Sequence, residues 1–267
     1  MKRVALAVAL FVLCCAASRA GVEAGSAAFA RGDYAAAFEE FQALAERGDV
    51  VGEYWLGWLY ATGRGVAQDD GQAARWYRKA AEQGYAGAQY DLGVLYANGL
   101  SVAQDYHEAL SWYRKAAAQG YAPAQFNLGY LYSAKGMGVP QDDAQSVRWY
   151  RRAAEQGFGP AQNELGWMYF SGQGVAKDFG RAMQWYGKAA ARGYAPAQYN
   201  LGLMYLLGRG VAADPVAAYR WFLLAAAGGS RGARERLAQL GSVLSAAQIA
   251  RARAMAGAPA DGTGVGK

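Results

Sequence analysis

An internal repeat of about 36 residues is the feature that most constrains how this chain can fold. A Leu-Gly pair occurs five times at steps of 36, 36, 37 and 36 residues, and a tryptophan recurs at the same steps. A fixed period between about 20 and 50 residues is typical of similar modules that stack on their neighbours. The Leu-Gly pairs begin at Leu56, Leu92, Leu128, Leu165 and Leu201, and the tryptophans are Trp76, Trp112, Trp149, Trp185 and Trp221. The sequence therefore predicts five stacked units over residues 50–229.

Each unit has the pattern of two helices, named here helix A and helix B. In the first unit Leu56, Leu59 and Tyr60 fall at i, i+3 and i+4, which places them on one face of helix A. In helix B, Ala73, Trp76, Tyr77, Ala80 and Ala81 repeat this spacing. The fold class predicted from these periods is all-α, with one helix-turn-helix hairpin in each repeat.

The ends of the helices are marked by residues with capping chemistry. An aspartate lies seven residues before each repeat tryptophan, where its carboxylate can accept hydrogen bonds from the first N–H groups of helix B. Glycines follow both helices, and glycine tolerates the left-handed backbone that commonly ends a helix. Inside helix A, Gly57 and its equivalents cost about 1 kcal/mol relative to alanine. We expect these glycines to admit the bulky Trp76-Tyr77 pair of a neighbouring helix.

The residue inventory excludes several classes of chemistry. One histidine, His107, and two adjacent cysteines, Cys14 and Cys15, cannot supply three or four metal ligands. Residues 228–232 spell G-x-S-x-G, but they follow a predicted helix, and His107 lies upstream of the serine. We therefore predict no catalytic residues, no metal site and no cofactor.

The first 20 residues have the pattern of a secretory signal peptide. Lys2 and Arg3 precede an apolar run from Val4 to Ala17, and small residues stand at Ser18 and Ala20. The alternative of a single spanning helix stays open, although the run is short for a hydrocarbon core that takes about 20 residues. We expect export to the periplasm or the cell exterior, with no membrane span once the leader is removed.

The positive charge of the chain is weak evidence for nucleic acid. Cleavage after Ala20 would remove Lys2, Arg3 and Arg19, and the net charge would fall from +6 to +3. A nucleic-acid-binding chain needs a clustered basic stripe. We therefore predict no nucleic-acid partner.

The repeat resembles a known family. The pattern A-Q-Y-x-L-G-x-L-Y-x-x-G-x-G-V-x-x-D-x-x-x-A-x-x-W-Y-x-K-A-A-x-x-G is similar to the Sel-one-like repeat, a relative of the tetratricopeptide hairpin. The resemblance implies a right-handed α-solenoid whose helices A line a concave surface, and members that act mainly as adaptors and scaffolds. One cysteine-rich branch is associated with β-lactamase activity, so a hydrolase is the alternative function. Its cysteine pairs are missing from this chain.

The ends of the array differ from the five full units. Terminal repeats have only one neighbour and need a polar outer face. We expect a partial repeat or cap over residues 21–49, capping helices over 230–256 and a disordered tail over 257–267.

Helix A positions that vary between units are the candidate binding residues on the implied concave face. The residue two before each leucine is usually aromatic, and so is the residue two after it in three of the units; being four apart, the two positions share one face of the helix. Rigid aromatic anchors are enriched at interaction hot spots, although packing between repeats is the simpler account of the first position and an equal alternative for the second. The first set is Tyr54, Tyr90, Phe126, Asn163 and Tyr199, and the second contains Trp58, Tyr130 and Trp167, with Phe170 beside it.

A polar ladder lies between these aromatic positions. Its members are Asp91, Asn127, Glu164 and Asn200, with Trp55 in the first unit. Asparagine can donate to and accept from a peptide backbone, whereas a solvated helix face is the simpler interpretation. The hypothesis drawn from the sequence is an exported, non-enzymatic scaffold that binds a partner polypeptide, possible roles being envelope assembly or signalling.

Overall fold

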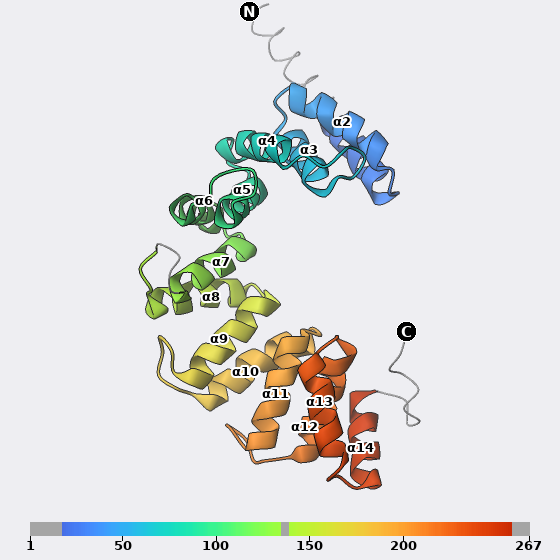
Figure 1. Cartoon of the computed structure of the whole chain (residues 1–267), viewed down its shortest axis with the longest axis vertical. Coiled ribbons are helices and arrows are strands. Elements are labelled where there is room, and N and C mark those ends of the chain that lie inside the picture. Colours follow the sequence, from blue (N-terminus) through green and yellow to red (C-terminus); the bar gives the residue numbers. More distant parts are fainter. Residues whose placement is uncertain (1–17, 135–138, 258–267) are drawn as a thin grey trace, which may run out of the picture. The chain divides into compact units, whose positions relative to one another are not determined.

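The computed structural model describes residues 18–134 and 139–257, and within these ranges the regular structure is helical with no strand. Residues 18–30 are helical and are followed by α2 (Tyr34–Glu46). Helices A of the five repeats are α3 (Val50–Thr62), α5 (Ala86–Asn98), α7 (Ala122–Ser133), α9 (Gly159–Ser171) and α11 (Ala195–Leu207). Helices B are α4 (Asp70–Glu82), α6 (Tyr106–Ala118), α8 (Asp143–Glu155), α10 (Phe179–Ala191) and α12 (Pro215–Ala227), and the chain continues into α13 (Arg231–Gly241) and α14 (Ala246–Ala256). The predicted all-α repeat fold of solenoid type is confirmed (Figure 1).

The helices form two compact units. The first holds the described helices up to α6, and the second holds most of α7 and the helices that follow it. In the first unit each helix from α2 to α6 packs against the next one along the chain. In the second unit the same holds from α8 to α12, and α12 contacts both α13 and α14. Within each unit a helix therefore packs mainly on its neighbours in sequence, as expected for a repeat protein.

Aspartate caps define where every helix B begins. The Asp69 side chain accepts a hydrogen bond from the backbone N–H of Gln72 over 2.9 Å. The same arrangement recurs at the other four predicted caps, which are Asp105, Asp142, Asp178 and Asp214. Each carboxylate satisfies at least one N–H group that has no partner within the helix. The sequence prediction of these helix starts is confirmed.

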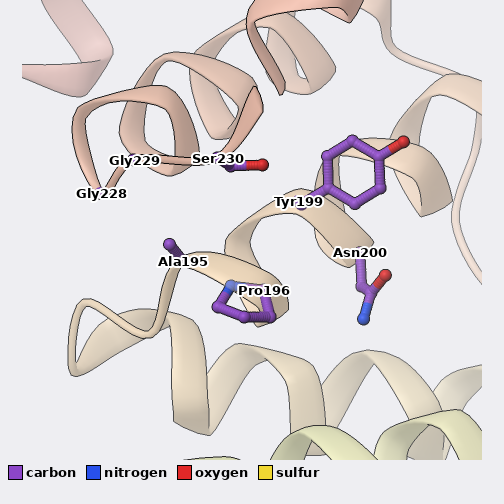
Figure 2. A pocket seen from close by; sticks show the side chains of 7 residues that line it. All are labelled: Ala195, Pro196, Tyr199, Asn200, Gly228, Gly229 and Ser230. Carbon is purple, nitrogen blue, oxygen red and sulfur yellow. The ribbon is translucent and has the colours of Figure 1, made fainter. Parts of the chain in front are cut away.

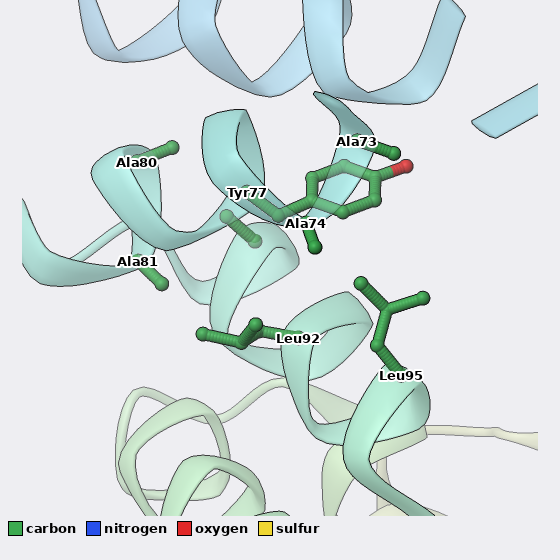
Figure 3. Close-up of a cluster of buried hydrophobic side chains, with 8 residues drawn as sticks. Ala73, Ala74, Tyr77, Ala80, Ala81, Leu92 and Leu95 are labelled. Carbon is green, nitrogen blue, oxygen red and sulfur yellow. The ribbon is translucent and has the colours of Figure 1, made fainter. Parts of the chain in front are cut away.

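Small residues on helix B let it approach helix A closely. In the first unit a buried cluster combines the alanines of α4 with Tyr77 and with Leu92 and Leu95 of α5 (Figure 3). Ala73, Ala80 and Leu92 are completely inaccessible to solvent. The core of each repeat is thus a layer of small and aliphatic side chains with one large ring, which is a tyrosine in the first four repeats and Phe222 in the fifth.

The glycine inside each helix A is required by that ring. A Cβ atom placed on Gly57 would lie 2.8 Å from Cδ1 of Tyr77, and one on Gly166 would lie 2.7 Å from Cδ1 of Tyr186. We expected both Trp76 and Tyr77 to pack against the glycine. The structure confirms this for Tyr77 and not for Trp76, because Tyr77 supplies the atoms nearest to Gly57. Trp76 is half-buried, and its ring lies under the ammonium group of Lys79 at 4.0 Å. Two adjacent aromatic residues on a helix point about 100° apart, so they cannot fill the same gap.

The described ends of the array are covered by helices. Phe29, at the end of the helical residues 18–30, packs with Tyr34, Trp55 and Trp58. At the other end Ser245 caps α14, and Gln248 completes a reciprocal capping box. Most of the predicted leader (residues 1–17), part of the longer turn of the third repeat (135–138) and nearly all of the predicted disordered tail (258–267) lie outside the described residues. Among the helices described, none combines the length and the apolar character that crossing a membrane takes.

Candidate partner-binding site

One position of helix A carries a large side chain whose exposure differs between repeats. It is the position directly after the Leu-Gly pair, occupied by Trp58, Tyr130 and Trp167 in the first, third and fourth repeats. Tyr130 is 50% exposed and Trp167 is 48% exposed, whereas Trp58 is partly buried. The repeat places all three residues at the same point on helix A, so their neighbours decide how much of each ring reaches solvent.

Trp58 and Trp55 take part in the packing of the N-terminal segment. The Phe29 ring lies 5.0 Å from the Trp55 ring and 5.1 Å from the Trp58 ring, measured between centroids. The guanidinium of Arg64 lies 5.3 Å from the centroid of Trp58. Aromatic pairs and cation–π contacts at these distances are favourable. These two predicted site residues therefore help to hold the first repeat to the segment before it.

Trp167 has a different environment in the second unit. Its ring stacks on Phe170 of the same helix, with centroids 5.7 Å apart and planes 22° apart. A small cavity of about 40 Å³ lies between α9 and α11. Its lining residues are Trp167, Phe170, Asn200 and Leu203, with Tyr186 and Met204 beneath them. Helices A of the fourth and fifth repeats thus meet at a partly open aromatic site.

We call the exposed side of these helices the A-helix face and define it by Tyr130, Trp167, Phe170, Asn200 and Leu203. All five residues belong to the second unit. Leu203 occupies the position of Trp58 in the fifth repeat. The face combines two exposed rings, a stacked ring, an aliphatic side chain and an amide.

The inner aromatic position of helix A is occupied by packing contacts. Tyr54, Tyr90, Phe126 and Tyr199 are all partly buried. Each ring lies 5.4–5.8 Å from an aromatic ring of helix B in its own repeat. Those partner rings are Tyr77, Tyr113, Tyr150 and Phe222. The geometry thus places this column in the packed contacts between neighbouring helices, which we call the joints of the repeats.

The fourth repeat has Asn163 in place of that inner ring. Asn163 is 7% exposed, and its amide nitrogen donates to Glu164 over 3.0 Å. Its amide oxygen accepts from Asn200 over 2.9 Å. Asn163 and Asn200 therefore form a polar link between α9 and α11, and part of their hydrogen-bonding capacity is used inside the protein.

The acidic members of the ladder are shielded from water. Burial raises the pKa of Asp91 to about 6, and the hydroxyl of Tyr54 donates a hydrogen bond to it, which opposes the shift. Burial likewise raises the pKa of Glu164, and the Asn163 amide opposes that shift. Asn127 holds the equivalent position in the third repeat and is partly buried. The ladder is therefore a set of partly enclosed polar groups that bond within the protein, and the partners of Asp91 and Asn200 belong to the preceding repeat.

A second hollow lies at the last repeat and was not predicted. It is lined by Ala195, Pro196, Tyr199, Asn200 and the turn Gly228–Ser230 (Figure 2). The sequence does carry a signal for it. The turn that follows helix B reads Gln-Gly-Tyr in the first two repeats and Gly-Gly-Ser in the fifth. Two large side chains are thus missing at this joint.

A comparison with protein-family models identifies the repeat. The model described as Sel1 repeat matches five consecutive segments, residues 50–85, 86–121, 122–158, 159–194 and 195–230. These segments have the bounds of the five hairpins seen in the structure, and together they cover well over half of the chain. None of the curated proteins searched is similar enough to this chain to count as a match.

Solved structures show the same architecture. A Sel1 repeat protein from Oxalobacter formigenes superposes with a TM-score of 0.76 at 34% identity, over 83% of this chain and 90% of that one. The protein c5321, described as a protective antigen of uropathogenic Escherichia coli with an SLR fold, superposes with a TM-score of 0.57 at 30% identity, over 90% of this chain and 60% of that one. The immunity protein Pa5087 from Pseudomonas aeruginosa gives a TM-score of 0.51 at 23% identity, over 78% of this chain and 81% of that one, and it supports the fold alone.

Proposed function

Because the chain belongs to the Sel1 repeat family, whose scaffold-type fold is typical of protein–protein interaction, we propose that it binds a partner polypeptide through its A-helix face. In this proposal the chain acts as a non-enzymatic adaptor. The partner meets helices A of the third, fourth and fifth repeats.

The observation that carries the proposal is the exposure of Trp167 together with Tyr130. Tryptophan and tyrosine are the residues most enriched at binding hot spots, because they bring a large rigid surface at a small entropic cost. Trp167 leaves 48% of its surface in solvent although Trp58, at the same place in the first repeat, is packed against Phe29. The alternative interpretation of this column as packing between repeats therefore accounts for Trp58 better than for Trp167.

The polar groups beside the rings suit an extended polypeptide. Asn200 and Leu203 line the cavity at Trp167, so an amide and an aliphatic side chain stand next to the exposed indole. An asparagine amide can pair with both the N–H and the C=O of a peptide backbone. A partner with an apolar anchor side chain flanked by free backbone groups would match this arrangement.

We also propose that the chain is exported and acts at the cell envelope or outside the cell. The support is the leader pattern of residues 1–20 in the sequence. Fractionation of producing cells, with mass measurement of the purified product, would test it. Export predicts a product that begins at Gly21, and a cytosolic product with the intact leader would refute it.

A peptide library gives the direct test of the binding face. Peptides selected on the wild-type protein are titrated by calorimetry against Trp167→Ala and Tyr130→Ala. We expect each variant to bind the selected peptides about tenfold more weakly, the loss of one moderate hot spot.

The matched control is Val243→Ser, because Val243 is 75% exposed and lies outside the A-helix face. This control is expected to bind as the wild type does. If the selected peptides bind the double variant Tyr130→Ala/Trp167→Ala as tightly as the wild type, the proposed face is wrong.

A further inference from the structure

The joints between successive repeats share one construction, which is altered in the fourth repeat and changes most in the fifth. Each helix B is followed by a three-residue turn, and in the first three repeats the first and third side chains of the turn reach into the joint. The turns are Gln83-Gly84-Tyr85, Gln119-Gly120-Tyr121, Gln156-Gly157-Phe158, Arg192-Gly193-Tyr194 and Gly228-Gly229-Ser230. The fifth turn is the one that offers no large side chain at either position.

The third residue of the turn supplies a ring that packs on helix A of the same repeat. Ring centroids are 4.8 Å apart for Tyr85 and Tyr54, and 5.5 Å apart for Tyr121 and Tyr90. The third joint repeats the pair with Phe158 and Phe126 at 5.6 Å. The molecule therefore contains three examples of the contact that this position of helix A makes with an aromatic side chain.

Tyr199 occupies that position in the fifth repeat and lacks the second ring. It keeps the contact with its own helix B, where the centroid of Phe222 lies at 5.5 Å. Ser230 stands where Tyr85 stands in the first joint, and its hydroxyl caps α13 by accepting from the N–H of Ala233. A pocket of about 360 Å³ lies beside Tyr199.

The walls of this pocket are laid out in Figure 2. The turn Gly228–Ser230 lies on one side, Ala195 and Pro196 lie on the other, and the Tyr199 ring stands at one end. The amide of Asn200 lies near Pro196, so polar groups of Asn200 and Ser230 lie beside the apolar surfaces of Ala195, Pro196 and the Tyr199 ring. A ring with one polar substituent, such as a phenol, matches this combination.

The first residue of the turn also lacks its usual side chain in the fifth repeat, where Gly228 replaces a glutamine. Gln83 donates to Glu53 over 2.7 Å, and Gln119 donates to Gln89 over 2.9 Å. The equivalent acceptor in the fifth repeat is Oε1 of Gln198, which is buried and has no hydrogen-bond partner among the described residues. Gly228 stands at the donor position and cannot donate from a side chain. The fifth repeat therefore keeps the acceptor Gln198 and the helix A ring of Tyr199. It lacks the two turn side chains that contact these positions in the first two repeats.

We infer that this pocket receives a tyrosine or phenylalanine side chain of a partner polypeptide, which lies against Tyr199 as Tyr85 lies against Tyr54. The inference rests on the proposed function only in that the ring is carried by a protein or peptide partner. The pocket shares Asn200 with the cavity at Trp167, and its other lining residues are different. The ring is an external one, because Ser230 provides none from the chain itself.

The test is a protein-observed NMR titration with 4-methylphenol, the side chain of tyrosine without its backbone. In the wild type we expect shifts concentrated at Ala195, Tyr199 and Ser230. N-acetyl-leucinamide, which carries an aliphatic side chain, is expected to bind more weakly than N-acetyl-tyrosinamide, because leucine cannot form an aromatic pair with Tyr199.

Two substitutions of one residue separate filling of the pocket from loss of the helix cap. Ser230→Tyr restores the ring of the other joints and should weaken binding of 4-methylphenol at least about tenfold. Ser230→Ala loses the same cap but leaves the pocket open, so binding should stay within about twofold of the wild type. Melting curves recorded on both variants verify that each is folded.

Three outcomes would overturn the inference. They are the absence of binding to the wild type, equal binding to the wild type and to Ser230→Tyr, and shifts that centre on Trp167 instead of Tyr199. The last outcome would leave the A-helix face intact as the binding surface. Conversely, loss of peptide binding in Trp167→Ala tests the proposed function without touching this pocket.

Discussion

Trp58 and Trp167 occupy the same position of helix A, in the first and fourth repeats, and have different environments. Trp58 lies beside Phe29 at 5.1 Å and under the guanidinium of Arg64. Trp167 stacks only on Phe170 among the rings of the described residues and leaves 48% of its surface exposed. The repeat fixes which face a side chain is on, and the residues beyond the repeat fix whether that face is covered.

The difference has a physical origin in the ends of the array. A terminal repeat has one neighbour fewer, so it needs a covering segment to keep its apolar face out of water. Residues 18–30 and α2 provide this cover for the first repeat through Phe29 and Phe41. A ring within the array that remains exposed has no such structural purpose, and this is why Trp167 carries the functional proposal.

The largest expected effect separates the two tryptophans by stability. Trp58→Ala should lower the free energy of unfolding by about 3 kcal/mol, near the low end for truncating a large packed ring. Trp167→Ala should lower it by less than about 1 kcal/mol, because an exposed ring loses little on truncation. Urea titrations followed by circular dichroism measure both. Equal losses in the two variants would remove the basis of the comparison.

A second pair of substitutions tests a feature that the first and fourth repeats share, the crowded glycine of helix A. Gly57→Val and Gly166→Val should each destabilise by about 2 kcal/mol, because the new side chain collides with Tyr77 or Tyr186. The matched control is Gly187→Ala, since a Cβ atom there meets no atom within 4 Å beyond the adjacent residues and the nearby backbone of its own helix. It should stabilise the protein by up to about 1 kcal/mol. Clearly unequal losses at the two crowded glycines would show that the joints of the two units are not equivalent.

A third contrast concerns the ladder beside the tryptophans and depends on pH. The pKa of Asp91 is raised in the folded protein to about 6, so the folded state binds a proton more readily than the unfolded state. Stability from this group is therefore present at low pH and falls as the pH rises from about 4 through about 6. Asp91→Asn removes that cost, and Asn127 and Asn200 show that asparagine is accommodated at this position in other repeats.

Above pH 7 we expect Asp91→Asn to be more stable than the wild type by about 1 to 2 kcal/mol. Near pH 4 the two proteins should differ little. Melting temperatures measured from pH 4 to pH 8 test this, and a constant difference across that range would show that burial of the Asp91 carboxylate is not its cause.

The smallest expected effect concerns the joint that follows Trp167. In the first repeat Gln83 donates to the buried Glu53, whereas Oε1 of Gln162 has no partner among the described residues. Arg192 stands at the donor position and bonds instead to the carbonyl of Gly157. Arg192→Gln should supply the missing donor and raise the free energy of unfolding by about 1 kcal/mol. Calorimetric melting of the variant checks this, with Arg31→Gln as a surface control, and a loss of stability would contradict it.

Much of the fold was predictable because it is local and repeated. The spacing of Leu56, Leu59 and Tyr60 defines a helix face, and Asp69 marks the start of the next helix by accepting a hydrogen bond from the N–H of Gln72. Five copies of each signal make the pattern visible above the variation of single residues. The assignment of Tyr77 alone to the gap at Gly57 needed the structure, because adjacent rings cannot be ranked by spacing.

The candidate site was predictable in position and less so in exposure. The helix A columns were visible in the sequence, but the cover over Trp58 comes from Phe29, which lies outside the repeat. The link from Asn163 to Asn200 depends on side-chain rotamers across two helices. The pocket at Tyr199 could have been predicted from the change of Gln-Gly-Tyr to Gly-Gly-Ser, which becomes informative once the contact of Tyr85 with Tyr54 is known.

The most direct test of the account is an NMR titration of the indole N–H signals with a library-selected peptide. The chain has eight tryptophans, and single Trp→Phe variants assign their signals. We predict that the Trp167 signal shifts on peptide addition while the Trp58 signal stays in place. A shift of Trp58 without a shift of Trp167 would contradict the claim that the A-helix face of the second unit binds the partner.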